Sequence, residues 1–233
     1  MSTSPFPTTR RSVLIALASG DADERERAFG TLVGCYWKPL YKYARVHWGR
    51  GREDAEDLAQ SFFVTALERE SLAGYDATKA SFRTFLRVLF DRYLANEYKA
   101  STRLKRGGGA VQLDFEAAEA EIGLDPQTQT ATPEEYFQRE WVRSVFALVV
   151  ERLRQVCKAE QFAVFEAYDL EDDRTVSYRA LAERFGVPET QVTNWLAAAR
   201  RRFRALVLET LREVTASEQE FRAEARALLG VDA

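Results

Sequence analysis

The chain has 233 residues, of which 46% are hydrophobic and 30% are charged, and its formal net charge is −3. This length and apolar content predict one large globular domain or two smaller ones, and they exclude a chain that is disordered throughout. The slightly acidic total argues against a protein that coats nucleic acid through bulk positive charge. The charges are nevertheless segregated along the sequence.

Residue types that perform covalent catalysis or bind metals are scarce. His47 is the only histidine in the sequence, and the two cysteines, Cys35 and Cys157, lie far apart. The sequence therefore predicts neither a His/Cys metal site nor a Ser-His or Cys-His pair, and it requires no cofactor. We expect both cysteines to be reduced thiols and the protein not to be an enzyme.

Arg10-Arg11, followed by apolar residues 13–18, faintly resembles an export signal, but the apolar run is too short and Asp21 follows closely. We predict an amphipathic first helix there instead. No apolar run in the sequence approaches the length of a membrane span, so we expect a cytoplasmic protein without a membrane partner.

Helical spacing of apolar residues recurs along almost the whole chain, whereas period-two alternation does not. We therefore predict an all-α fold, built as two helical bundles joined by an acidic flexible linker. The first bundle, within residues 1–106, should contain helices at 11–19, 22–48, 53–70 and 81–105.

The helix expected at 53–70 begins with an acidic cluster. This cluster is Glu53-Asp54-Ala55-Glu56-Asp57, and Gln60 and Ser61 continue Glu53, Glu56 and Asp57 along one side of the helix. Carboxylates at a helix N-terminus are favourable in themselves, because the helix dipole is positive there. The alternative is a docking face for a basic partner surface, which would give specific and fast association.

The helix expected at 81–105 carries a basic stripe. Its members, at spacings of 4, 3, 4 and 3 residues, are Arg92, Asn96, Lys99, Arg103 and Arg106. This spacing places them on one face of the helix. Basic groups with aromatic residues nearby suit a nucleic-acid strand whose bases are unstacked and held. The alternative is an ordinary core helix with a solvated basic face.

Residues 107–135 are expected to form the linker. Residues 110–135 hold seven acidic residues and no lysine or arginine, together with Pro126 and Pro133. A segment of this composition is typical of extended, solvated chain.

The second bundle is expected within residues 136–215, and a C-terminal segment follows at 216–233. The helices predicted for these two parts lie near 134–156, 159–168, 177–185, 189–215 and 218–229. The last of them is amphipathic.

Residues 177–204 predict a helix-turn-helix. Ser177 can cap the first helix, Gly186 permits a left-handed turn, and Pro188 suits the opening of the next helix. The second helix has an apolar stripe of Val192, Leu196, Ala199 and Phe203. The alternative is an αα-hairpin whose basic end is exposed to solvent and binds no DNA.

The second helix of this motif has the features of a recognition helix. Short polar side chains that can reach base edges project from its first turns: Thr190, Gln191, Thr193 and Asn194. Arginines that can hold phosphates follow them: Arg200, Arg201 and Arg202. The motif therefore favours DNA binding.

Three stretches taken together, residues 54–60 (DAEDLAQ), residues 82–86 (FRTFL) and the helix-turn-helix, resemble a bacterial RNA polymerase sigma factor of the extracytoplasmic-function group. The resemblance covers residues 10–215. It implies that 1–106 is a sigma region 2-like domain for core polymerase binding and −10 recognition and melting. It implies that 136–215 is a region 4-like domain for −35 recognition. The implied partners are promoter DNA and core RNA polymerase, through the clamp of its largest subunit.

The same resemblance assigns roles to the motifs. The helix that grips the polymerase clamp would be the one that carries Asp54, Glu56, Asp57 and Gln60. Loop 71–80 and the Arg92–Arg106 stripe would read and melt the −10 element and capture flipped bases. The polar residues 190–194 would face the −35 element in the major groove, and the acidic linker would enter the nucleic-acid channel of the polymerase.

The chain departs from the family pattern at several positions. Ser61 stands where relatives usually carry a carboxylate, and Asp91-Arg92 where they commonly carry Arg-Asn. Thr193, Trp195 and Ala198 often correspond to Lys or Arg. A phosphate on Ser61 would restore the negative charge, which suggests a Ser/Thr kinase as a partner and Ser61 as a phosphosite. An anti-sigma factor is a second regulatory partner that the resemblance suggests.

A stand-alone helix-turn-helix regulator, binding an operator without polymerase, is the main alternative. It explains the second bundle but leaves the acidic cluster, the linker and the basic stripe without a purpose. An interaction protein comes next, and the clustered arginines at 200–204 argue against it.

Overall fold

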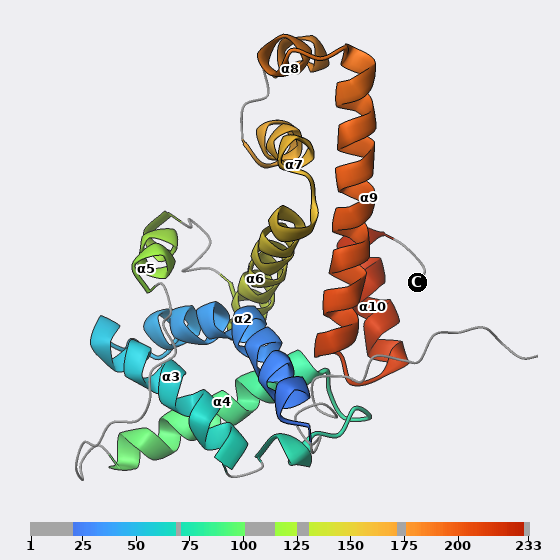
Figure 1. Ribbon diagram of the computed structural model, residues 1–233. Coiled ribbons are helices and arrows are strands. Elements are labelled where there is room, and N and C mark those ends of the chain that lie inside the picture. Colours follow the sequence, from blue (N-terminus) through green and yellow to red (C-terminus); the bar gives the residue numbers. More distant parts are fainter. Residues whose placement is uncertain (1–20, 69–70, 101–114, 125–130, 172–175, 231–233) are drawn as a thin grey trace, which may run out of the picture. The chain divides into compact units, whose positions relative to one another are not determined.

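The computed structural model describes residues 21–68, 71–100, 115–124, 131–171 and 176–230, and the helix expected at 11–19 lies outside them. Within these ranges the regular elements are all helices, which confirms the all-α part of the predicted fold class (Figure 1). The elements are α2 (Ala22–Val46), α3 (Arg52–Glu68), the short 3₁₀ helix η1 (Ser71–Gly74), α4 (Phe82–Ala100), α5 (Phe115–Leu124), α6 (Pro133–Val156), α7 (Ala159–Phe165), the one-turn π-helix η2 (Glu166–Leu170), α8 (Tyr178–Phe185), α9 (Glu189–Val214) and α10 (Glu218–Leu229).

Capping residues set the start of α2 and both ends of α10. The Asp21 carboxylate accepts hydrogen bonds from the amides of Asp23 and Glu24, at 2.9 and 3.1 Å, and so caps α2. Ser217 caps α10 by accepting from the Glu220 amide at 3.1 Å. Gly230, with φ of 64°, ends α10 in the left-handed conformation that glycine adopts without strain.

The expectation of an extended linker is wrong for the residues of α5. This acidic helix packs against the basic side of α2. Glu119 accepts hydrogen bonds from the Arg45 guanidinium and the Tyr41 hydroxyl. Glu121 forms ion pairs with Lys38 at 2.8 Å and with Lys42 at 2.5 Å. The composition that predicts a solvated chain instead finds complementary charge on a neighbouring helix.

The chain divides into two compact units, and the division differs from the expected one. The first unit is Met1–Val145 with Leu211–Ala233, and the second is Phe146–Thr210. The beginning of α6 and the whole of α10 therefore belong with α2, α3 and α4.

Aromatic side chains form the core of the first unit. Tyr36 of α2 is fully buried, and its ring contacts Phe82 edge-on at 5.9 Å and Trp141 at 6.3 Å. Phe62 of α3 meets Phe90 of α4 edge-on at 5.0 Å. Each such pair adds about 0.5–1.5 kcal/mol beyond the burial of its area.

Ion pairs also lie inside the first unit. Lys42 and Glu140, whose side chains are 1% and 2% exposed, are 2.5 Å apart. Arg83 and Glu224 are 2.6 Å apart and both buried. A buried charge is tolerated only beside an opposite charge, so each pair fixes one helix against another.

Stacked phenyl rings organise the second unit. Phe203 of α9 lies parallel to Phe146 at 5.7 Å and contacts Phe165 at 5.6 Å. Val192, Leu196 and Ala199 are buried, which confirms the predicted apolar stripe of this helix.

Replacing Lys42 by Met should lower the free energy of unfolding by about 3 kcal/mol, because Glu140 stays buried with only the Arg143 pair left. Urea denaturation followed by circular dichroism measures the loss. Lys38→Met is the matched control on the same helix, since Lys38 shares the partner Glu121 but is 23% exposed. It should cost less than about 1 kcal/mol. Equal losses in the two variants would contradict this assignment.

Acid should weaken the docking of α5. The hydrogen bonds from the Arg45 guanidinium, opposed by burial, lower the pKa of Glu119 from 4.5 to about 2. A carboxyl whose folded pKa is lowered stabilises the docked state above pH 4.5, and this contribution is lost as the pH falls to 2. Titration of the Glu119 carboxyl carbon by NMR should show this midpoint, and Arg45→Gln should move it back toward 4.5. An unchanged midpoint in that variant would show that Arg45 is not the cause.

Candidate nucleic-acid interface

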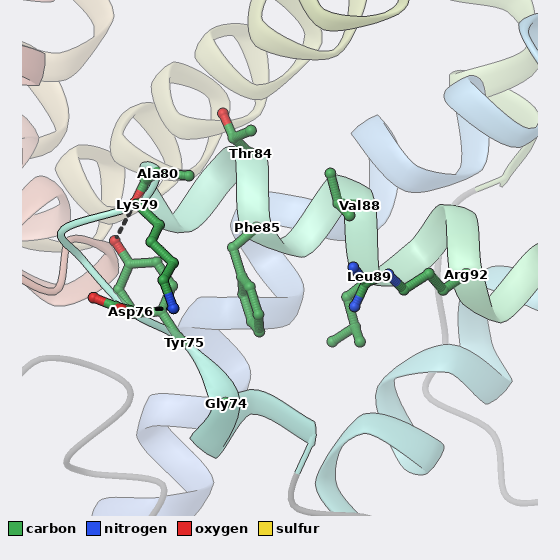
Figure 2. A pocket seen from close by; sticks show the side chains of 10 residues that line it. All are labelled: Gly74, Tyr75, Asp76, Lys79, Ala80, Thr84, Phe85, Val88, Leu89 and Arg92. Atoms are coloured by element: carbon green, nitrogen blue, oxygen red, sulfur yellow. Dashed lines mark hydrogen bonds and ion pairs between the residues drawn. The ribbon is translucent and has the colours of Figure 1, made fainter.

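A pocket of about 180 Å³ lies in the first unit, between the loop that follows η1 and one side of α4 (Figure 2). Figure 2 shows Phe85 and Leu89 pointing from α4 in the same direction, with Tyr75 beside them and Arg92 one turn further along. The walls are therefore apolar and aromatic, and a cation stands at one end.

Hydrogen bonds within the loop give the pocket its second wall. The Asp76 carboxylate accepts from the Thr78 hydroxyl at 2.7 Å and from the Thr78 amide at 3.0 Å, and it pairs with Lys79 at 3.1 Å. The Thr78 side chain is the main cause that lowers the pKa of Asp76 to about 2. The Tyr75 hydroxyl donates to the Ala80 carbonyl at 2.9 Å, which closes the loop on itself.

The predicted basic stripe reaches this pocket at one residue. Arg92 lines the pocket, and both Arg92 and Asn96 are exposed. Within the described residues Arg92 forms no ion pair, since the neighbouring Asp91 pairs with Arg87. The side chain of Lys99, and the whole of Arg103 and Arg106, lie outside the described residues.

Phe85 and Leu89 line the pocket, although neither is among the site residues that the sequence predicts. The signal was present, because residues 85, 89 and 92 follow one another at spacings of 4 and 3 and therefore share a face with the basic stripe.

The predicted polymerase-binding residues on α3 differ in exposure and in ion pairing. Asp54 and Asp57 are exposed, and their carboxylates form no ion pair in the part of the chain that is described. Glu56 is half-buried and pairs with Arg52 at 2.9 Å, and Gln60 is half-buried. Of the four residues predicted to bind polymerase, Asp54 and Asp57 are thus exposed carboxylates without an ion pair among the described residues.

Ser61 lies on the same helix and is exposed. Its hydroxyl donates to the Asp57 carbonyl and lies 2.8 Å from the Tyr93 hydroxyl of α4. A phosphate at Ser61 would therefore add charge beside Asp57 and replace a hydrogen bond between α3 and α4.

In the second unit, a three-residue turn at 186–188 joins α8 to α9. Ser177 caps α8 by accepting from the Ala180 amide at 3.1 Å, and Gly186 adopts φ of 65°, as the sequence predicts. At the start of α9, Thr190, Thr193 and Asn194 are exposed and Gln191 is half-buried. These side chains lie on the side of α9 opposite to its buried stripe.

The arginines further along α9 differ from one another. Arg201 and Arg202 are exposed and form no ion pair among the described residues. Arg200 instead donates two hydrogen bonds to Asp169 of η2, at 2.7 and 2.9 Å, and lies 5.4 Å from the centre of the Tyr168 ring. The Asp169 hydrogen bonds raise the pKa of Arg200. A phosphate would therefore have to displace Asp169 before it could bind Arg200.

Among the described residues, no group of three or more His, Cys, Asp or Glu side chains is placed to hold a metal ion. The described helices include none with the length and apolar character needed to cross a membrane. No protein-family model, curated protein or solved structure matches the chain. Its function is therefore inferred from its own residues.

Gly186→Ala tests the turn before α9. A Cβ at this position meets no atom within 4 Å, but the backbone φ of +65° strains any L residue, so the substitution should cost about 1–2 kcal/mol. Gly30→Ala is the matched control, because Gly30 also has open space but lies inside α2 at an ordinary φ, and it should gain about 1 kcal/mol. Native-state hydrogen exchange in each unit measures both changes. A gain at Gly186 would contradict the left-handed turn.

Proposed function

We propose that this protein is a sigma factor that binds core RNA polymerase and directs promoter-specific transcription initiation. The pocket beside α4 is the observation that carries the proposal. A base turned out of duplex DNA can enter it and stack on an aromatic ring, while Arg92 attracts the adjacent phosphate.

The size and chemistry of the pocket support a small planar occupant. Its volume of about 180 Å³ is below the range of about 300–1,000 Å³ that is usual for drug-sized ligands. Tyr75 and Phe85 line the pocket with aromatic rings, which pack against each other at 5.2 Å with a tilt of 59°. Lys79 of the loop is paired with Asp76, so Arg92 of α4 is the lining cation that can attract a strand passing over the opening.

The acidic cluster supports the polymerase half of the proposal. Asp54 and Asp57 project unpaired carboxylates from the first turns of α3. A basic partner surface would be complementary to these carboxylates, and such complementarity speeds association.

The first turns of α9 support contact with duplex DNA. Exposed Thr190, Thr193 and Asn194 are short polar side chains of the kind that reads base edges in the major groove. Arg201 and Arg202 lie two turns further along and can meet the phosphates beside the groove. We assign this helix to the upstream promoter element and the pocket to the melted downstream one.

A stand-alone regulator remains the second candidate, because α8 and α9 alone account for operator binding. It leaves the pocket and the unpaired carboxylates of α3 without a ligand. The two candidates differ in whether DNA binding requires polymerase.

Run-off transcription with purified core polymerase on genomic DNA fragments tests the proposal. The wild-type chain should co-purify with the core enzyme and yield defined transcripts, whereas the free chain should bind duplex DNA weakly and with steep salt dependence. Tight operator binding by the free chain, without transcripts, would support the regulator instead.

Substitution of the acidic cluster tests the polymerase contact. Asp54→Ala combined with Asp57→Ala should weaken core binding about tenfold or more, because two charges facing the basic partner are lost. Glu26→Ala combined with Glu160→Ala changes the net charge equally at exposed positions elsewhere and should leave binding unchanged. Equal affinities of the two double variants would remove α3 from the interface.

A further inference from the structure

Glu220 of α10 contacts both parts of the chain that form the pocket. One carboxylate oxygen accepts from the Phe82 amide at 2.7 Å, at the first residue of α4. The other oxygen accepts from the Tyr75 hydroxyl at 3.3 Å and from the Ala216 amide at 3.0 Å. Phe82 and Tyr75 lie 138 and 145 residues away from Glu220 in the sequence.

The two partners connect directly to the pocket walls. Tyr75 lines the pocket from the loop, and Phe82 begins the helix that supplies the opposite wall. The Tyr75 ring lies edge-on to Phe82 at 5.3 Å and contacts the wall residue Phe85 at 5.2 Å. A single carboxylate therefore holds the separation between loop and helix.

The chemistry of the contact favours this arrangement. A carboxylate at the N-terminus of α4 is stabilised by the unpaired amides and by the helix dipole. Burial, and then the negative charge of Glu220, raise the pKa of the Tyr75 hydroxyl, so it stays protonated and can donate. The Ala80 carbonyl at 2.9 Å and the Glu220 carboxylate at 3.3 Å share the single proton of this donor.

The helix that carries Glu220 is itself held firmly. Glu224, one turn further along α10, forms the buried pair with Arg83. Phe221 is buried, and the Arg212 guanidinium lies 4.0 Å from the centre of its ring. These contacts place Glu220 independently of the loop that it binds.

We propose that Glu220 is a positioning residue, through which the C-terminal helix α10 holds the pocket open for an unpaired base. The inference rests on the proposed function, because it assigns the pocket to single-stranded promoter DNA. It gives a purpose to the segment after Thr215, for which the sigma-factor resemblance has no counterpart.

Three variants separate positioning from general stability. Glu220→Ala removes the acceptors for Phe82 and Tyr75, and Glu220→Gln keeps one acceptor oxygen. Glu218→Ala is the control on the same helix, because Glu218 is exposed and pairs only with Arg212 and Arg222 among the described residues. The probe is a fluorescent single-stranded oligonucleotide of the non-template strand, taken from a promoter that the wild-type chain transcribes, bound to the polymerase holoenzyme.

Glu220→Ala should weaken oligonucleotide binding about tenfold, as expected for losing hydrogen bonds to a charged group. Glu220→Gln should recover part of this loss, and Glu218→Ala should bind like wild type. All three should bind core polymerase with wild-type affinity. In the free chain, hydrogen exchange of the Phe82 amide and of the amides in loop 74–80 should become faster in Glu220→Ala. It should stay unchanged in Glu218→Ala.

Wild-type oligonucleotide affinity in Glu220→Ala would overturn the inference, and so would an equal loss of core binding and oligonucleotide binding. If wild type yields no transcripts, the proposed function fails, and an oligonucleotide of random sequence replaces the promoter strand as the probe. Unchanged exchange at Phe82 would overturn the positioning role whatever the DNA result.

Discussion

A carboxylate buried inside the first unit needs a cation or an amide as its partner. This constraint determines how the helices of the unit pack against one another. Glu140 faces Lys42 across α6 and α2, and Glu224 faces Arg83 across α10 and α4. Removing one member would leave a buried charge without compensation, so the register of each helix pair is fixed. Since Arg83 is the second residue of α4, the C-terminal helix defines where the pocket wall begins.

The charged groups of the first unit differ in whether they are already paired within the chain. Lys38, Lys42 and Arg45 of α2 are paired with carboxylates of α5 and with Glu140. Arg92, by contrast, is exposed at the pocket. Arg92 thus offers a cation beside the cavity without an ion pair among the described residues, and Asp54 and Asp57 offer unpaired carboxylates on α3.

Local features of the structure could be predicted from the sequence, and distant pairings could not. Ser177 and Gly186 set the ends of α8 through their own backbone neighbours, and the apolar stripe of α9 follows from helical spacing alone. The helicity of α5 depends on basic residues of α2 more than 70 positions earlier. The pairing of Arg200 with Asp169, and the contacts of Glu220, likewise join segments whose proximity no local pattern encodes.

The most direct test of the central claim is permanganate reactivity of thymines on a promoter fragment that yields run-off transcripts. With the chain and core polymerase together, thymines around the −10 element should become reactive, because bases are unpaired there and held in the first unit. Neither component alone should produce this pattern. Duplex-like reactivity in the complete mixture, despite firm binding of the fragment, would contradict the account.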